Sequence, residues 1–143
     1  MTEQIRLALL AAWHDCPEDY RSQPASEEEL SSFEAEFGLI PPAFREYLAV
    51  CDGGIGGSPE WIDGLAELGA TQRHYSTGIL EGWFTMRDVF VIGWDGCGNP
   101  FGIERSSGRV LVEDHDFGGI HEMAPSFTDL LLQGLQRYLS PGN

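Results

Sequence analysis

Residues 89–113 read VFVIGWDGCGNPFGIERSSGRVLVE, and this stretch decides the fold. Short apolar runs in it alternate with clusters of glycine, asparagine and serine at 95–99 and 106–108, a pattern typical of strands joined by tight turns. The connections are too short for crossover helices, so neighbouring strands are expected to run antiparallel. The predicted strands cover residues 89–92, 101–104, 109–113 and 120–123.

Helices are predicted on both sides of this meander. Thr2 can cap a first helix that ends before Pro17. Ser26 and Glu29 have the spacing of a capping box at the start of a second helix. A third helix is expected to start at Pro41 or Pro42, and the last at Ser126. The apolar positions at helical spacing are Leu30, Phe33 and Phe37 in the second helix, Phe44, Tyr47, Leu48 and Cys51 in the third, and Phe127, Leu130, Leu131, Leu135 and Leu139 in a single final helix.

This order of elements predicts an α+β fold. The N-terminal helices and the C-terminal helix are expected to pack on one face of an antiparallel meander. A length of 143 residues lies near the commonest domain size, so residues 1–143 are expected to form one domain. Only the glycine-rich stretch 53–82 gives no clear element.

The charge balance bears on the kind of partner. Twenty-three acidic residues against eight basic ones give a formal net charge of −15, and every basic residue is arginine. Affinity for nucleic acids comes mainly from positive charge, so this composition argues against a nucleic-acid or anionic-membrane binder. The absence of lysine also excludes Schiff-base chemistry. No apolar run reaches 18 residues, which predicts a cytoplasmic protein without a membrane span.

The sequence offers one tempting chemical cluster, Glu113-Asp114-His115-Asp116 with His121 and Glu122 nearby. Carboxylate and imidazole groups are metal ligands and general acid–base groups. Adjacent residues of an extended chain point to opposite faces, however, so a solvated turn is the favoured interpretation. Asp95 and Asn99 lack the ligand spacing of a calcium loop, since Cys97 occupies its third position. We therefore expect no catalytic residue, no metal and no cofactor.

The surplus of surface acid permits two interpretations. It can serve solubility alone, or it can attract a basic protein partner. In the second case, carboxylates at strand ends would speed association, and exposed aromatic rings in glycine-rich loops would hold the partner. The candidate carboxylates are Asp95, Glu113, Asp114, Asp116 and Glu122, and the candidate rings are Trp61, Trp83 and Phe117.

Four motifs follow one another in a recognisable order. The first, SEEELSSFEAEFGLIPPAFREYLAVCDGG over 26–54, combines an acidic helix, a glycine–proline turn and a glycine pair. VIGWDGCGNPFGIE (91–104), SSGRVLVEDHD (106–116) and APSFTDLLL (124–132) follow. In this order they resemble the SUKH superfamily, bacterial immunity proteins related to fungal cell-wall assembly regulators, over about residues 26–133. One departure is Ile40-Pro41-Pro42, where that family has a single leucine before proline.

The resemblance implies a function. It suggests a non-enzymatic immunity protein that binds and neutralises a cognate toxin domain, often a nuclease or a deaminase. A nuclease is basic where it grips phosphate, so an acidic inhibitor would be drawn to that site. The fungal relatives imply an alternative, a regulatory or scaffold domain without a toxin partner. Neither the toxin nor the oligomeric state follows from the sequence.

Overall fold

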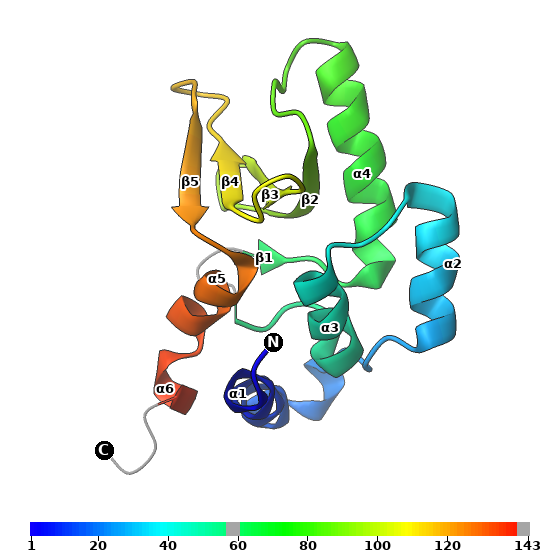
Figure 1. Cartoon of the computed structure of the whole chain (residues 1–143), viewed down its shortest axis with the longest axis vertical. Helices are drawn as coiled ribbons and strands as arrows, with labels where there is room; N and C mark the ends of the chain where they lie inside the picture. Colours follow the sequence, from blue (N-terminus) through cyan, green and yellow to red (C-terminus); the bar gives the residue numbers. More distant parts are fainter. Residues whose placement is uncertain (57–60, 140–143) are drawn as a thin grey trace.

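Five strands form one antiparallel sheet in chain order, β1-β2-β3-β4-β5 (Figure 1). The structure is a computed structural model and describes residues 1–56 and 61–139. The strands are β1 (Trp61–Ile62), β2 (Val89–Trp94), β3 (Pro100–Glu104), β4 (Val110–Glu113) and β5 (Ile120–Ala124). The helices are α1 (Glu3–Asp15), α2 (Glu27–Phe37), α3 (Pro42–Cys51), α4 (Leu65–Leu80), α5 (Phe127–Gly134) and α6 (Gln136–Leu139), with a 3-10 turn at Glu18–Tyr20. The predicted α+β class and antiparallel meander are confirmed.

The register of the meander creates two distinct ends of the sheet. Trp94 pairs with Pro100, and Glu113 pairs with Ile120, so the turn 95–99 and the loop 114–119 lie at the same end. We call these two segments the turn end. Val110 pairs with Ala124 at the opposite end, which carries the turn 105–109 and the entry to α5. We call that the groove end.

The main core lies between one sheet face and the N- and C-terminal helices. Alternate residues of β2 and β3, such as Phe90, Ile92 and Phe101, belong to a single buried cluster with side chains of α1, α2, α3 and α5. Figure 1 shows α1, α3 and α5 gathered below the sheet. The expected packing of the terminal helices on one face is therefore confirmed.

The caps predicted from the sequence are present. The Thr2 hydroxyl accepts from the Ile5 amide, and Ser26 and Glu29 exchange side chain to backbone hydrogen bonds of 3.0 and 3.1 Å. The third helix starts at Pro42, the later of the two predicted positions. These local signals fix where the N-terminal helices begin.

Helix α4 was not predicted, and it stands beside β2 (Figure 1). Leu68 near its start reaches the main core, whereas Tyr75 further along packs with Phe84, Met86 and Val91 in a second cluster. Because Val91 alternates with Phe90 and Ile92, this second cluster covers the opposite face of the sheet. The buried positions of α4 include Thr71 and Gly78, so its amphipathic pattern is weak.

The prediction of a single final helix through Leu139 is wrong. Helix α5 ends at Gly134, and Leu135 leaves the helical conformation with φ −109° and ψ 16°. The backbone of Gly56 lies so close that a side chain at Gly134 would meet its carbonyl oxygen, so the loop after α3 packs at the break. Within the described residues, none of the helices is long and apolar enough to cross a membrane.

Candidate functional site

Asp95 shapes the first segment of the turn end. Its Oδ1 accepts from the backbone amides of Cys97 (2.8 Å) and Asn99 (2.9 Å), and its Oδ2 accepts from the Asn99 side-chain amide (2.9 Å). Partial burial opposes ionisation of this carboxyl, but the hydrogen bonds outweigh it and hold the pKa of Asp95 below its ordinary value. Asp95 is thus an ionised carboxylate whose acceptor positions already close a turn.

Asn99 joins the two segments of the turn end. Its buried side-chain oxygen accepts from the His115 backbone amide (3.0 Å) and contacts His115 Nδ1. In the loop 114–119, Asp114 Oδ1 accepts from the amides of Asp116 (2.9 Å) and Phe117 (3.0 Å). A deformation of one segment is therefore transmitted to the other through Asn99.

These contacts favour the turn interpretation of the acidic cluster. The carboxylates of Asp95 and Asp114 bind backbone amides, and the ring of His115 lies 3.5 Å from Asp116 Oδ1. Among residues 1–56 and 61–139, no three histidine, cysteine or acidic side chains are grouped as metal ligands would be.

Glu113 does not belong to an exposed acidic surface, so this part of the sequence expectation is wrong. The residue is only 6 % exposed. Its carboxylate accepts from the Thr85 amide (2.7 Å), the Thr85 hydroxyl (2.9 Å) and the Met86 amide (2.8 Å). Glu113 is buried because the segment that follows α4 lies against the end of β4 and donates its hydrogen bonds to this carboxylate.

Glu122 is exposed, but its charge is partly balanced. Arg109 lies 3.7 Å from Glu122 and 2.9 Å from Glu104. Of the five candidate carboxylates, the turn end therefore brings together Asp95, Asp114 and Asp116. Whether these three contact a partner stays a prediction.

The three candidate aromatic rings are all exposed, by 55 % at Trp61, 62 % at Trp83 and 93 % at Phe117. Trp61 lies opposite Trp94 at the same end of the sheet as the turn 95–99, and Phe117 lies in the loop 114–119. Trp83 follows α4 and lines a pocket with His115. Sequence reasoning thus found exposed aromatic residues, and the fold gathers them around the turn end.

The three cysteines differ in accessibility. Burial raises the pKa of Cys51 to about 12, so this thiol stays protonated and serves packing. Cys16 is half-buried, and Cys97 is exposed in the turn 95–99.

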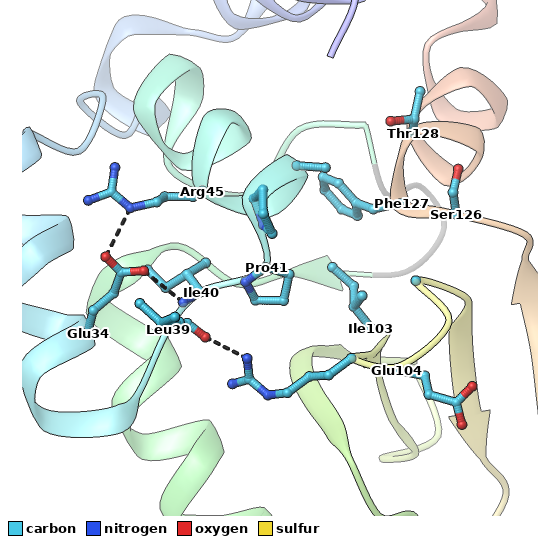
Figure 2. Close-up of a pocket in the computed structure, with 14 residues that line it drawn as sticks. Glu34, Leu39, Ile40, Pro41, Arg45, Ile103, Glu104, Ser126, Phe127 and Thr128 are labelled. Atoms are coloured by element: carbon cyan, nitrogen blue, oxygen red, sulfur yellow. Dashed lines mark hydrogen bonds and ion pairs between the residues drawn. The ribbon is translucent and has the colours of Figure 1, made fainter.

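An apolar groove of about 640 Å³ lies at the groove end, and sequence reasoning missed it (Figure 2). Its walls come from the α2–α3 connection, the turn after β3 and the first turn of α5. On one wall, Glu34 bonds Arg45 Nε (3.1 Å) and the Ile40 amide (2.9 Å). Arg105 donates to the Leu39 carbonyl (2.7 Å), which ties the α2–α3 connection to β3. The sequence signal for it was the run Gly38-Leu39-Ile40-Pro41-Pro42, in which Leu39 proves to be exposed.

The groove is lined mainly by apolar side chains and by polar groups that already have partners. Among the described residues, no histidine or cysteine lines it. The one hydroxyl beside a carboxylate, that of Ser126, caps α5 by accepting from the Asp129 amide and donating to its carboxylate. The two ends of the sheet therefore differ: the turn end carries exposed rings and carboxylates, and the groove end carries an apolar groove.

The model of the SMI1 / KNR4 family (SUKH-1) matches residues 24–133. The chain belongs to this family. The match confirms the resemblance drawn from the sequence motifs, and it includes both ends of the SUKH-1 sheet. Comparison with curated proteins gave no match.

Proposed function

We propose that this SUKH-1 chain is a cytoplasmic bacterial immunity protein that binds a basic toxin domain and blocks it with the turn end. Membership of the family supports an immunity or regulatory role of this general kind. The observation that carries the finer proposal is the uncompensated acid of the molecule, a formal net charge of −15.

The eight arginines are too few to neutralise the 23 acidic residues, and they already have partners within the molecule. Five of the eight pair with carboxylates, among them Arg45, whose pKa the bonds to Glu27 and Glu34 raise further. The other three, Arg21, Arg87 and Arg105, donate to backbone carbonyls. Since lysine is absent from the sequence, every cationic side chain already has an intramolecular partner. Most acidic residues that the structure describes are exposed, and Asp63 and Glu113 are buried exceptions.

An acidic inhibitor suits a toxin that grips nucleic acid. Such an enzyme, a nuclease or a deaminase acting on nucleic acid, has a basic surface near its active site, and opposite potentials steer the two proteins together. The carboxylates of the turn end would then occupy positions used by phosphates, and the exposed rings would exclude water around them. Inhibition of this kind needs only occlusion, without catalysis by the immunity protein.

A genetic experiment separates this proposal from the alternative, a regulatory domain without a toxin partner. Co-expression should protect cells from the toxin encoded next to the gene and leave unrelated toxins active, because specificity is a difference of affinities. Deleting the gene beside the active toxin should be lethal. Viable deletion strains that still produce active toxin would favour the regulatory domain.

A further inference from the structure

A second pocket, of about 390 Å³, opens at the turn end between α4, the segment after it and the two turn-end loops. Its lining residues are His74, Trp83, Phe84, Gly98 and His115. Four of these five residues carry aromatic rings, and no arginine is among them. The pocket is thus a ring-lined hollow at the acidic end of the molecule.

The rings of this pocket are held in place. The Trp83 and Phe84 amides both donate to the Gly78 carbonyl at the end of α4. Phe84 is buried against Tyr75, with ring centroids 5.7 Å apart, and packs 6.0 Å from Trp94. His74 meets Trp94 edge to face at 5.3 Å. A ligand therefore meets a preformed wall, with Trp83 as its exposed rim.

Carboxylates flank the pocket on the loop side. Asp116 Oδ1 lies 3.5 Å from His115 Nε2, and Asp95 closes the turn that contains Gly98. Glu113 accepts a hydrogen bond from the amide of Thr85, the residue after Phe84. The negative charge near the rings favours a cation, since the face of an aromatic ring also attracts positive charge.

We propose that this pocket receives a cationic side chain of the partner, an arginine, with its guanidinium against Trp83 and its charge opposite Asp116. The planar guanidinium stacks on aromatic rings and pairs with carboxylates at once, which a compact ammonium does less well. Where the partner is concerned, this inference rests on the proposed function. The pocket itself can be tested without any toxin.

The first test uses the full chain and a small probe. N-acetylarginine methylamide is titrated into protein labelled with ¹⁵N at the tryptophan indoles, and N-acetylcitrulline methylamide, which has the same shape without the charge, serves as the matched probe. The Trp83 indole signal should shift in a saturable way with the arginine probe, and citrulline should bind roughly fivefold more weakly. Equal binding of both probes, or the absence of a saturable shift of the Trp83 indole signal, would overturn the proposal.

The second test changes the pocket. Trp83→Ala and Asp116→Asn should each weaken binding of the arginine probe roughly fivefold. Leu80→Ala removes another exposed apolar side chain that does not line the pocket, and Asp19→Asn removes a carboxylate of the N-terminal region, so both should bind like the wild type. Urea unfolding of each variant shows that it is folded. Wild-type affinity in Trp83→Ala would exclude the pocket as the binding site.

The two proposals fail separately. If a cognate toxin binds the wild type and both pocket variants with the same dissociation rate, the pocket inference is wrong and the immunity function stands. If the arginine probe binds as described and the neighbouring gene encodes no toxin, the pocket inference stands and the immunity proposal is wrong.

Discussion

At Glu113, a single buried carboxylate satisfies two consecutive backbone amides and the hydroxyl of Thr85. Glu113→Ala would leave these donors without a partner, and each buried donor costs about 1–3 kcal/mol, so we expect a loss of about 3 kcal/mol in the free energy of unfolding. Glu122→Ala, the matched change on the exposed neighbouring strand, should stay within about 0.5 kcal/mol. Urea titration measures both. Equal effects would show that the anchor at Thr85 contributes nothing.

Asp63 makes stability depend on pH in an unusual direction. Burial and the nearby Glu67 outweigh the hydrogen bond from the Thr71 hydroxyl and raise the pKa of Asp63 to about 6 from an ordinary 3.8. Below 3.8 the group is protonated in both the folded and unfolded states. As the pH rises from 3.8 to about 6, the unfolded state loses its proton first, so the contribution of Asp63 to stability falls, and above about 6 it stays at this lower level.

Asp63→Asn removes this dependence while keeping an acceptor for Thr71. Compared with the wild type, the variant should gain on the order of 3 kcal/mol between pH 3.5 and pH 8, since one pKa unit corresponds to about 1.4 kcal/mol. The measurement is the difference in unfolding free energy between the two proteins at each pH. A difference that stays constant across this range would contradict the raised pKa.

Single residues also show which features of the site could be predicted from the sequence. The exposure of Trp61, Trp83 and Phe117 was foreseeable, because each lies in a glycine-rich stretch without periodicity. The burial of Glu113 could not be foreseen. The alternation of residues along β4 indicates which face of the sheet a side chain occupies, but it does not indicate which distant segment covers that face. Likewise, Trp83 and His115 line one pocket from 32 positions apart.

Among the elements, β1 depends on a glycine in its neighbour. A Cβ at Gly93 of β2 would lie 2.0 Å from the Trp61 carbonyl oxygen and 2.7 Å from the Phe101 ring. Gly93→Ala should therefore separate β1 from β2 and cost about 3 kcal/mol. Gly96→Ala, three positions along, meets nothing within 4 Å and should be close to neutral. Urea titration compares the two, and hydrogen exchange at the Asp63 amide, which donates to Ile92, reports whether the pairing is lost.

The helices and strands also differ in how clearly the sequence predicts them. Helix α2 carries a capping box, a buried stripe and a terminal glycine, and β2 to β4 are apolar runs between turn residues, so all were predicted. Helix α4 buries Leu68, Thr71, Tyr75 and Gly78, and only two of these are large and apolar. Its position against the sheet depends on the packing of Tyr75 with Phe84, and a local sequence pattern does not predict this contact.

For the whole molecule, the net charge predicts how association responds to salt. Charges separated by more than about 8 Å are screened at physiological ionic strength, so the association rate with a basic toxin should fall as salt rises. Changing Asp95, Asp114 and Asp116 together to asparagine should lower the association rate about tenfold at low salt and affect dissociation less. The matched variant changes Glu18, Asp19 and Glu28 of the N-terminal region to the corresponding amides.

Stopped-flow measurements at several salt concentrations test this prediction. If both triple variants associate at the wild-type rate and salt has no effect, the acid serves solubility and the interface lies elsewhere. Asparagine at position 95 keeps a side-chain acceptor for the turn. The triple substitution should therefore affect the free energy of unfolding less than it affects the association rate.

The exposed thiol of Cys97 gives the turn end a built-in attachment point. A maleimide dye placed there, in a Cys16→Ser background with Cys51 buried, would sit in the turn that contains Gly98 of the ring-lined pocket. Docking of any protein on this end would change the polarity around the dye, whereas occupation of the groove at the other end would leave its emission unchanged. One fluorophore thus distinguishes binding at the turn end from binding at the groove end in solution.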